Sequence, residues 1–457
     1  MGVLADKLTV FGDPVDQNAV EQIANCLKDE RAVAGALMAD HHKGYSLPVG
    51  GVIEYEGAIS PSGVGYDIAC GNKAVRTNIS FADLHTSSTR SVKRTIRIID
   101  PIMRAIAANV NFGMGGNTGF RADHELFGRE VWIDIERLHP GLRQKAQTQL
   151  GTVGSGNHYV DILVDEADGQ IWVANHFGSR GLGHTIATGV MNLNDNLDWR
   201  ARRLDSEVPS VIDDDTDLGQ FYIDAMNLAG EYAYAGRDLV IDQVLKILGV
   251  HTTLEVHNHH NFAWKENGRW VIRKGATPLT TEPAFIGGSM GDISVIVRGR
   301  PTGHVSVPDF VERVEDIGAL GSAPHGAGRV MSRTQAGGKF RKMWRCPNWN
   351  CTFVPVRSIG GSDSGHPKNK CPLCGIPLVL TKRMRDASTG QINWREVRAD
   401  LRERGIVVIG ADAEEAPGVY KSLETVLDAH SNIEVLHVLQ PLGVVMAGPD
   451  IDDPYKD

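Results

Sequence analysis

Hydrophobic and polar positions follow two rhythms along this chain, one typical of helices and one typical of strands. Residues 16–30 carry an apolar stripe at helical spacing, and Asp16 stands where a helix N-cap is expected. The stripe consists of Val20, Ile23, Ala24 and Leu27. Helical spacing returns over residues 222–248, so the sequence predicts a helix in each of these segments.

A third helix is predicted over residues 393–405, which read NWREVRADLRERG. Asn393 is its expected cap, and Gly405 is its expected stop because glycine readily adopts the backbone conformation that ends a helix. The side chains expected to face the core are Trp394, Val397 and Leu401.

Runs of β-branched residues between glycine turns predict strands from residue 47 to about 80. Further strand-like runs occupy residues 161–165, 170–175, 269–274, 292–299 and 406–410. Because helices and strands are interspersed, we predict a mixed α+β fold. The residues able to do chemistry fall in loops at the ends of these strands.

The stretch from about 341 to 390 departs from this pattern. It holds four of the six cysteines, many turn residues and little hydrophobic periodicity. The helix and strand that follow it resume the pattern of the rest of the chain. We therefore predict a small inserted module at 341–390 within a single large domain formed by residues 1–340 and 391–457.

Composition narrows the classes of function. A chain of 457 residues with 42% hydrophobic and 23% charged residues is typical of a soluble globular enzyme. Its net charge of −9 disfavours nonspecific capture of nucleic acid by a broad basic field. A partner that carries phosphate must then be held locally, by placed arginine, lysine or metal.

The sequence predicts a cytoplasmic protein. No run approaches the roughly 20 apolar residues that span a bilayer. The first residues lack the basic segment followed by an apolar one that marks a signal peptide. Six cysteines are too few for a disulfide framework at this length, so we expect reduced thiols or metal ligands.

Glycine-rich loops carry a set of candidate metal ligands. Asp67 and Cys70 stand three residues apart in GVGYDIACG, a spacing at which carboxylate and thiolate can converge on one metal or bridge two. Alone, this pair would be better explained as a surface aspartate and a buried cysteine. Three histidine clusters favour a metal site instead; they hold His158 beside Asn157, His176, and the group His257, His259 and His260. Such a donor set suits Mn, Fe, Co or Zn.

Three cations flanked by glycine are candidate phosphate contacts. They are Arg180 in GSRGLG, Lys274 in RKGAT and Arg329 in HGAGR, where His325 also lies among small residues. Glycine leaves backbone amides accessible, and a guanidinium beside them makes a good fork for phosphate. The alternative for each is an ordinary turn with a solvated charge.

Three familiar catalytic motifs do not fit. GMGGNTG at 113–119 has Thr118 where the dinucleotide fingerprint needs its third glycine, and GGKF at 337–340 ends in Phe340 where a P-loop needs Ser or Thr. GGSMG at 287–291 matches the nucleophile elbow of serine hydrolases. That motif requires a following helix, whereas a strand is predicted here, which argues against a serine hydrolase.

A structural zinc site is predicted in the inserted module. CPNWNC and CPLCG each supply two cysteines, with nineteen residues between the pairs, as in a zinc ribbon. The four cysteines are Cys346, Cys351, Cys371 and Cys374. Two pairs of free thiols are the alternative.

Ten segments between about residues 33 and 446, outside the cysteine-rich insertion, resemble in order the motifs of the RtcB family of RNA-splicing ligases. They read MADHHKGYSLPVGG, GAISPSGVGYDIACG, QLGTVGSGNHYVDI, HFGSRGLGH, HHNFAWKE, RKGAT, GSMG, SAPHGAGRVMSR, AEEAPGVYK and QPLGVV. Ten motifs in the same order make chance agreement negligible.

The resemblance implies a GTP- and manganese-dependent ligase that acts in tRNA splicing or RNA repair. Such an enzyme joins an RNA 3′-phosphate or 2′,3′-cyclic phosphate to a 5′-hydroxyl end, and His325 would be the nucleophile that takes GMP as a phosphoramidate. The resemblance also implies the family's α+β fold with a central cleft for metal and nucleotide. An archease-type activating protein is a further partner that it suggests.

The resemblance assigns roles to individual residues. Two manganese ions would be held by Asp67, Cys70, His158, His176 and His260, with Cys70 bridging. His260 is chosen because the family's ligand immediately precedes the Asn of its HN motif. The nucleotide would contact Asn157, Ser289, Ser294, His325, Gly326, Ala327, Gly328 and Tyr420, the last against the guanine. Phosphate or RNA would contact Arg180, Lys274, Arg329, Asp40 and His42.

The chain departs from the family pattern at a few positions. Met446 stands where the family has a lysine that reads the guanine, and the chain continues for about ten residues beyond it. Asp161 stands where a glutamate is usual, and Ala39 where a proline is usual. The four-cysteine insertion is also untypical, so base recognition and substrate choice are where this chain is expected to differ.

Three other functions remain open. An enzyme that guanylylates nucleic-acid 3′-phosphates without joining them would use the same chemistry. A phosphoesterase with two metals and no nucleotide is an alternative of another class. A zinc-ribbon binding protein with an inactive cleft is a third, which the complete set of metal-type residues argues against.

Overall fold

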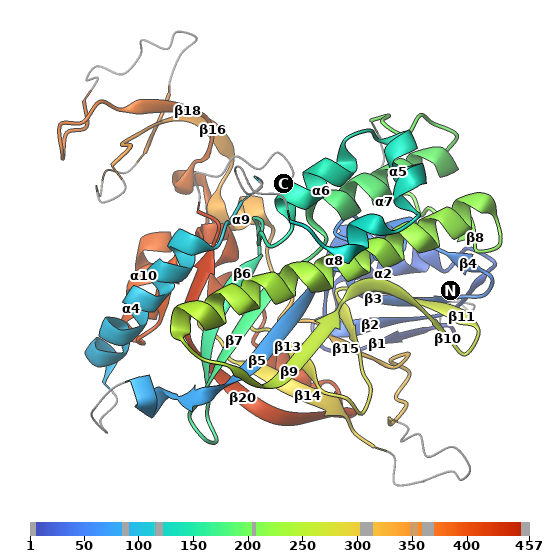
Figure 1. The fold of residues 1–457 in the computed structure, drawn as a ribbon, viewed down its shortest axis with the longest axis horizontal. Helices are drawn as coiled ribbons and strands as arrows, with labels where there is room; N and C mark the ends of the chain where they lie inside the picture. Colours follow the sequence, from blue (N-terminus) through green and yellow to red (C-terminus); the bar gives the residue numbers. More distant parts are fainter. Residues whose placement is uncertain are drawn as a thin grey trace.

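The computed structural model describes residues 6–84, 91–113, 115, 122–202, 207–301, 314–348, 351, 353, 355–358 and 370–448. The mixed α+β fold expected from the sequence is confirmed (Figure 1). Most of the GMGGNTG segment, residues 114 and 116–119, lies outside the described residues.

The largest sheet has eight strands, with the order β13-β14-β20-β6-β7-β5-β9 and with β19 paired to β20. Its strands are β5 (Gly71–Ser80), β6 (Tyr159–Asp165), β7 (Gln170–Phe177), β9 (Thr252–His259), β13 (Ala284–Ile286), β14 (Ser294–Gly299), β19 (Val407–Ile409) and β20 (Ile433–Met446). The pairs that join β6, β7, β5 and β9 are all antiparallel. This alternation decides which chain segments meet at each edge of the sheet.

A second sheet of five strands has the order β1-β2-β3-β11-β10. Its strands are β1 (Leu8–Val10), β2 (Ala32–Tyr45), β3 (Leu47–Tyr55), β10 (Asn261–Glu266) and β11 (Arg269–Lys274). Two short pairs join β4 (Ala58–Ile59) to β8 (Ile212–Asp213) and β12 (Ala276–Pro278) to β15 (Ser322–Pro324). The strands predicted from periodicity near 47–80, 161–165, 170–175, 269–274, 292–299 and 406–410 are therefore present, and their ends agree to within two residues.

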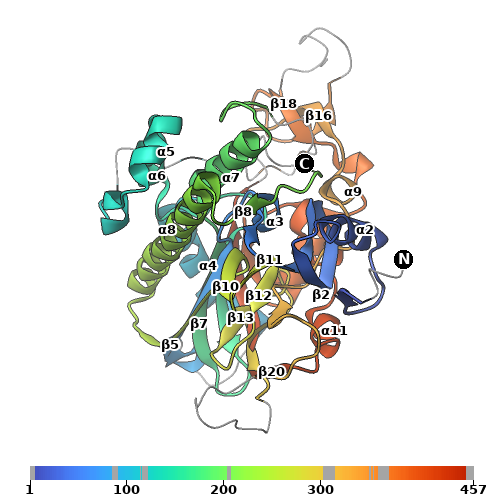
Figure 2. The same ribbon diagram turned by 90° about the vertical axis from the view of Figure 1, so that its right-hand side faces the viewer.

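The helices surround these sheets. They are α2 (Gln17–Cys26), α3 (Pro61–Val64), α4 (Val92–Asn109), α5 (Trp132–Leu138), α6 (Leu142–Gln149), α7 (Arg180–Asn194), α8 (Asp217–Leu248), α9 (Arg333–Gly337), α10 (Trp394–Glu403) and α11 (Leu423–Asp428). Helices α4 and α8 pack against strands of the large sheet, as Figure 2 shows from the side. None of the helices in the described ranges combines the length and apolar composition needed to cross a membrane.

The predicted N-terminal helix is confirmed, with a shorter extent. Asp16 caps α2, because its carboxylate accepts a hydrogen bond from the backbone nitrogen of Asn18 at 2.9 Å. The helix ends at Cys26 instead of residue 30. Of the expected stripe, Ile23 and Leu27 are buried and Val20 packs against the core, and the buried side also includes Ala19 and Cys26.

The other two predicted helices are also present. Helix α8 begins at Asp217, five residues before the expected start, and has 32 residues. Helix α10 follows Asn393, which occupies the cap position although its side chain makes no capping hydrogen bond there. Gly405 ends this segment with a left-handed φ of 87°.

Strands β16 (Phe340–Arg345), β17 (Val356–Arg357) and β18 (Val379–Arg385) form a separate three-stranded sheet. We call these strands, together with the four cysteines around them, the cysteine module. It projects from the main body in both ribbon views (Figures 1 and 2). The division of the chain into residues 1–340 and 391–457 with an insertion between them stays a prediction.

A fully buried arginine holds α8 to the large sheet. Arg237 donates to the carbonyl oxygens of Phe177 and Ala69 at 2.7 and 3.0 Å, and its guanidinium lies 2.9 Å from ring nitrogens of both His257 and His259. These contacts join α8 to the ends of β7 and β9 and to the loop before β5. Burial lowers the pKa of Arg237 to about 10, so the side chain remains charged at neutral pH.

We predict that Arg237→Met destabilises the protein. The substitution leaves two buried carbonyl groups without their donors, so the free energy of unfolding should fall by about 3 kcal/mol or more in urea denaturation. Arg137→Met is the matched control, because Arg137 is exposed and, among the described residues, forms an ion pair only with Asp134 one turn away. The control should change stability by less than about 0.5 kcal/mol, and equal losses in both variants would contradict the role of Arg237.

Candidate active site

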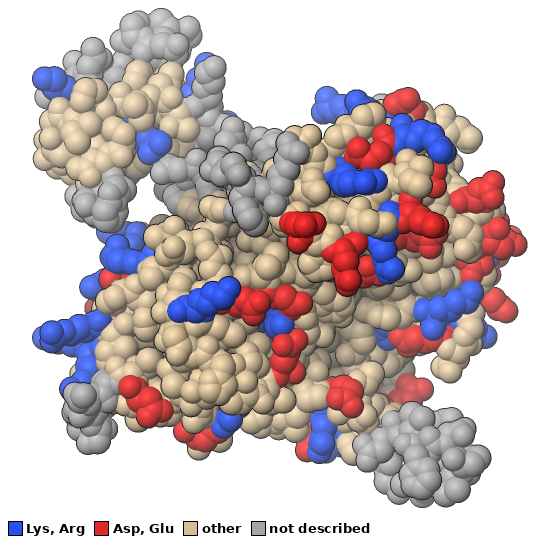
Figure 3. Space-filling model, viewed as in Figure 1, with Lys and Arg blue, Asp and Glu red and all other residues tan. Residues whose placement is uncertain are grey.

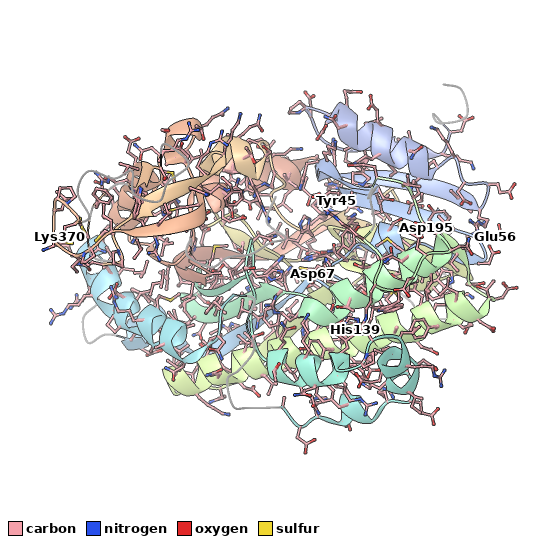
Figure 4. All side chains as sticks on the ribbon, turned by 90° about the horizontal axis from the view of Figure 1, so that it is seen from above. Tyr45, Glu56, Asp67, His139, Asp195 and Lys370 are labelled. Carbon is pink, nitrogen blue, oxygen red and sulfur yellow. The ribbon has the colours of Figure 1, made fainter. Side chains whose placement is uncertain are left out.

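Four adjacent strands bring the candidate metal ligands to one edge of the large sheet. Strands β7 and β9 end at this edge, whereas β6 and β5 begin there, because neighbouring strands run in opposite directions. The residues at these strand ends are Cys70, His158, His176 and His260. Asp67 lies in the loop just before Cys70, and Figure 4 shows it near the middle of the molecule.

The ligand atoms of these residues lie close together. His158 Nε2 is 3.1 Å from Asp67 Oδ2, and Cys70 Sγ lies 3.7 Å from His158 Nε2 and 3.4 Å from His176 Nε2. They form two groups of three, Asp67–Cys70–His158 and Cys70–His176–His260, in each of which the ligand atoms lie within 4.8 Å of one another. Cys70 belongs to both groups.

The donor set fits a pair of metal ions. Thiolate, imidazole and carboxylate are suitable ligands for Mn, Fe, Co or Zn, and a thiolate shared by two groups can bridge two ions. His260 Nδ1 is buried and has no hydrogen-bond partner among the described residues, as expected of an atom with another role. His176 Nδ1 lies 2.8 Å from Asn72 Oδ1, a contact that directs the Nε2 of this ring toward the shared thiol.

The structure separates His260 from the other two histidines of its cluster. His257 and His259 stand two residues apart on β9, so their side chains share one face, where both contact Arg237. His260 follows the last residue of β9, and its ring lies 4.9 Å from that of His176 and 4.8 Å from that of His325. Asp238, Glu255 and His257 also cluster, but Lys73 Nζ lies 2.5 and 2.9 Å from the two carboxylates and already offsets part of their charge.

His325 is oriented by a buried carboxylate. Asp40 is fully buried on β2, and its Oδ2 lies 2.7 Å from His325 Nδ1 while accepting hydrogen bonds from the backbone nitrogens of His325 and Gly326 at 3.1 and 3.3 Å. Burial raises the pKa of Asp40, but the neighbouring His325 and the hydrogen bonds to the carboxylate lower it by more. The pKa of Asp40 therefore lies below its usual value. In the neutral ring, an ionised Asp40 favours the tautomer with the proton on Nδ1 and the lone pair on Nε2.

A cavity of about 300 Å³ joins these groups. Most of the residues implied by the family resemblance line it, namely His42, Asp67, Cys70, Asn157, His176, His260, Lys274, Ser289, His325, Gly326, Ala327, Gly328, Arg329 and Tyr420. The two departures Asp161 and Met446 line it as well. Segments more than 300 residues apart in the sequence therefore meet in one cavity.

Four of the implied residues act from behind the cavity wall. Asp40 contacts His325, and His158 contacts Asp67 and Cys70. Ser294 Oγ accepts a hydrogen bond from the backbone nitrogen of Gly288, so it supports the loop that carries Ser289. Arg180 donates to the carbonyl oxygen of Gly113 at 2.7 Å, which ties the start of α7 to a neighbouring loop.

Arg329 and Tyr420 form a cluster with two glutamates on one wall. Arg329 Nη1 donates to the Tyr420 hydroxyl at 3.0 Å and to Glu415 Oε2 at 3.3 Å, and its Nη2 donates to the Glu414 carbonyl oxygen at 2.7 Å. The guanidinium also lies 5.1 Å from the Tyr420 ring centroid. These contacts hold the Tyr420 ring in a fixed orientation at the cavity.

Burial tunes two basic groups that line the cavity. It lowers the pKa of Lys274 to about 8 and that of His42 to about 4. Lys274 Nζ donates to the carbonyl oxygen of Tyr45. A lysine so placed remains mostly protonated at neutral pH, whereas His42 is neutral there.

The wall that contains Met446 is apolar. Met446, Met290 and Val444 pack together with the side chain of Tyr159 against this part of the cavity. Burial raises the pKa of Asp161 well above its ordinary value, and its Oδ1 has no hydrogen-bond partner among the described residues. Asp161 therefore brings one unpaired carboxyl oxygen to the cavity lining.

Several residues of this site were not found from the sequence. Asn72 and Arg237 orient metal-type ligands, and Asn261 accepts a hydrogen bond from the Gly275 nitrogen at 2.7 Å and donates to the Asp67 carbonyl oxygen at 3.3 Å. Glu415 completes the Arg329 cluster. Local sequence gave no signal for Asn72 or Arg237, which carry ordinary polar side chains in a strand and a helix. Asn261 is the Asn of the HN motif and Glu415 lies in AEEAPGVYK, so these motifs marked the two positions but not their contacts.

The four cysteines of the cysteine module form a second, separate cluster. Cys346 Sγ lies 3.4 Å from Cys374 Sγ, Cys351 Sγ lies 3.6 Å from Cys371 Sγ, and all four sulfurs lie within 4.8 Å of one another. None of them is in a disulfide. Tetrahedral zinc with Zn–S bonds of about 2.3 Å separates its sulfurs by about 3.8 Å, so the cluster fits this ion.

Comparison with known proteins identifies the family. The family model described as tRNA-splicing ligase RtcB matches residues 22–345. The chain is 31% identical over 357 residues to RNA-splicing ligase RtcB of Escherichia coli strain K12, which covers 72% of this chain and 82% of that protein. It is 27% identical to tRNA-splicing ligase RtcB of Pyrobaculum aerophilum, with 90% and 87% covered.

The chain belongs to the RtcB family of tRNA-splicing ligases. The resemblance stated from ten short motifs is thereby confirmed. The family match ends at Arg345, directly before the first cysteine of the cysteine module.

We predict that Cys70→Ala weakens metal binding at both groups of ligands, whereas loss of a ligand that belongs to one group would weaken binding at that group alone. The substitution removes the donor common to both groups of ligands, so manganese bound per chain, measured by elemental analysis after loading and desalting, should fall from about two to below one. Cys26→Ala is the control, because Cys26 is buried on α2 away from the cavity. Zinc content should stay unchanged in both variants, and full manganese retention in Cys70→Ala would contradict the bridging role.

Proposed function

We propose that this protein is an RNA ligase that joins a 3′-phosphate or 2′,3′-cyclic phosphate end to a 5′-hydroxyl end through a GMP attached to His325. The family supports RNA ligase activity, since its relatives are named tRNA-splicing or RNA-splicing ligases. The attachment of GMP to His325 is supported by the surroundings of this residue. Asp40 Oδ2 contacts its Nδ1, and the small residues Gly326, Ala327 and Gly328 line the cavity beside it.

The first step forms a bond between His325 and the nucleotide. The unprotonated Nε2 of His325 attacks the α-phosphorus of GTP, an N–P bond forms, and the bond to pyrophosphate breaks. The positive charge that develops on the ring is stabilised by the ionised Asp40 at 2.7 Å. Lys274 lines the same cavity and, in its protonated form, offers a donor for phosphate oxygens.

The later steps transfer the guanylate to RNA. An oxygen of the RNA 3′-phosphate attacks the phosphorus on His325, which restores the free imidazole and gives an activated RNA end. The 5′-hydroxyl of the second RNA end then attacks the activated phosphate, forming the phosphodiester and releasing GMP. A 2′,3′-cyclic end first needs hydrolysis to the 3′-phosphate.

Two manganese ions would be held by Asp67, Cys70, His158, His176 and His260, with Cys70 between them. When bound, they would neutralise charge on phosphate oxygens and lower the pKa of a coordinated hydroxyl or water. Asn157, Ser289 and Ser294 would bind or support the nucleotide site, and Tyr420 would lie against the base.

Base recognition differs from the family pattern. Met446 contributes only apolar surface where the family resemblance has a guanine-reading lysine. Asp161 also lines the cavity, and its Oδ1 has no partner among the described residues; in its ionised form the carboxylate would accept hydrogen bonds from the N1–H and exocyclic amine of guanine.

Zinc bound by Cys346, Cys351, Cys371 and Cys374 would be structural. A closed site with four thiolates leaves no open position for a substrate, so the ion stabilises the fold of the cysteine module. Phosphate or RNA contacts from Arg329 and His42, and an archease-type activating partner, belong to the same proposal, whereas Arg180 would support the loop at the start of α7 from behind the wall.

The proposal is tested by incubating the protein with manganese and α-³²P-labelled GTP. We expect an acid-labile label on the chain that is absent in His325→Ala, since the N–P bond of a phosphoramidate hydrolyses in acid. Labelled protein should then join RNA strands with 3′-phosphate and 5′-hydroxyl ends. Ser289→Ala, which removes a hydroxyl at the cavity but no attacking atom, should retain some labelling.

Each outcome of this experiment separates the alternatives. Labelling followed by transfer of GMP to RNA without joining would favour a 3′-phosphate capping enzyme. Absence of labelling with every nucleoside triphosphate, with release of phosphate from RNA ends, would favour a metal phosphoesterase and overturn the ligase proposal.

We further predict that Asp40→Asn slows labelling on the order of 10²-fold or more, because the amide cannot balance the positive charge on His325 as the N–P bond forms. The amide oxygen can still accept the backbone hydrogen bonds, so the affinity for GTP should change little. Single-turnover labelling across a range of GTP concentrations separates the two quantities. A raised GTP requirement with an unchanged maximal rate would show that Asp40 only supports the binding loop.

A further inference from the structure

The charge of this chain is distributed very unevenly. Residues 339–385 contain ten lysines and arginines but one acidic residue, Asp363, a formal charge of +9, although the whole chain carries −9. This segment corresponds to the cysteine module, so a net acidic protein bears one strongly basic projection. Such a concentration of one sign attracts a polyanion far more than the average charge of the protein suggests.

The positive side chains are exposed on the module. Lys342 on β16, Arg357 on β17 and Lys370 before Cys371 are all exposed. None of these three forms an ion pair with a carboxylate of the described residues. Figure 3 shows lysine and arginine, but no aspartate or glutamate, on the described surface of the module that faces the viewer. Their charges are therefore available to phosphates.

The base of the module is joined to the wall of the cavity. Arg385, the last residue of β18, pairs with Glu414 Oε2 at 2.6 Å, and Glu414 also accepts a hydrogen bond from Arg329 through its carbonyl oxygen. Arg333, at the start of the short helix that leads into β16, lines the cavity and pairs with Glu415 at 3.6 Å. The base of the module is therefore in direct contact with the cavity wall.

The module also extends well away from the cavity. In Figure 4, Lys370 lies at one extreme of the molecule while Asp67 lies near its middle. A strand whose end occupies the cavity and whose backbone runs outward along the module would meet cations at a distance from the reacting phosphate. Contacts of this kind hold an RNA strand without reading its sequence.

We propose that the cysteine module is a clamp for the backbone of single-stranded RNA, in which Lys342, Arg357 and Lys370 bind phosphates remote from the end held in the cavity. The inference rests on the proposed RNA substrate. It assigns the module a role beyond stability: it retains longer RNA strands, whereas the cavity alone recognises their ends.

The test compares two triple variants of the full-length, zinc-loaded protein. One variant, Lys342→Gln/Arg357→Gln/Lys370→Gln, removes the exposed cations of the module. The matched control, Lys28→Gln/Arg137→Gln/Lys246→Gln, removes three exposed cations from α2, α5 and α8 or their ends and so has the same net charge. Fluorescence anisotropy measures binding of a 3′-phosphorylated single strand of about 20 nucleotides between roughly 50 and 200 mM salt.

The module variant should bind this RNA more than about 10-fold more weakly at the lowest salt, and the slope of log affinity against log salt should be shallower by about 2, since each lost phosphate contact contributes about 0.7 for a single strand. The control should match the unmodified protein. Both variants should bind a strand of about 3 nucleotides equally, because so short a strand occupies only the cavity.

Equal affinities and slopes for the module variant and the control would overturn the proposal, including the case in which the module binds a protein partner instead of RNA. Labelling of His325 by GTP, measured without RNA, should be unchanged in the module variant. Failure of that labelling in the unmodified protein would reject the proposed function. RNA binding is measured without GTP, so the slopes of log affinity against log salt would still decide the role of the module.

Discussion

The candidate active site depends on one buried cation. Arg237 directs its donors to the carbonyl oxygens of Ala69 and Phe177 and contacts two histidine rings, so it fixes the loop that carries Asp67 and Cys70 against the ends of β7 and β9. Burial and the charge of Arg237 lower the pKa of His257 and His259, which keeps both rings neutral and able to accept hydrogen bonds. A charged group without a carboxylate partner is tolerated here because polar acceptors surround it.

This constraint explains why three clustered histidines have two functions. His257 and His259 serve Arg237 on one face of β9, whereas His260 lies beyond the end of the strand and reaches the other ligand-type residues. Asp40 likewise supports two features at once. One of its oxygens, Oδ2, contacts the ring nitrogen of His325 and the backbone nitrogens of His325 and Gly326, so it positions the ring and its loop together. The reactive side chains are thus held by groups that would never touch a substrate.

The wall formed by Arg329, Tyr420 and the two glutamates connects the cavity to the cysteine module. Glu414 contacts both Arg329 and Arg385, one on each side of this boundary. The family match ends close by, at Arg345. The candidate active site and the cysteine module are therefore joined by direct contacts, which is the arrangement expected if the module presents substrate to the cavity.

The sequence by itself determined the family, the mixed α+β class, most strands and three helices, because periodicity and local caps depend on neighbouring residues. It also singled out Asp67, Cys70, His176 and His325 through glycine-rich motifs. Helix ends were less certain: α2 stops at Cys26 and α8 starts at Asp217, since packing decides them. Only the tertiary structure decided that Asn72, Arg237 and Asn261 support the site and that Arg180 and Ser294 act from behind its wall. These roles arise from contacts between residues up to 168 positions apart for Arg237 and 194 for Asn261, separations over which no local pattern carries information.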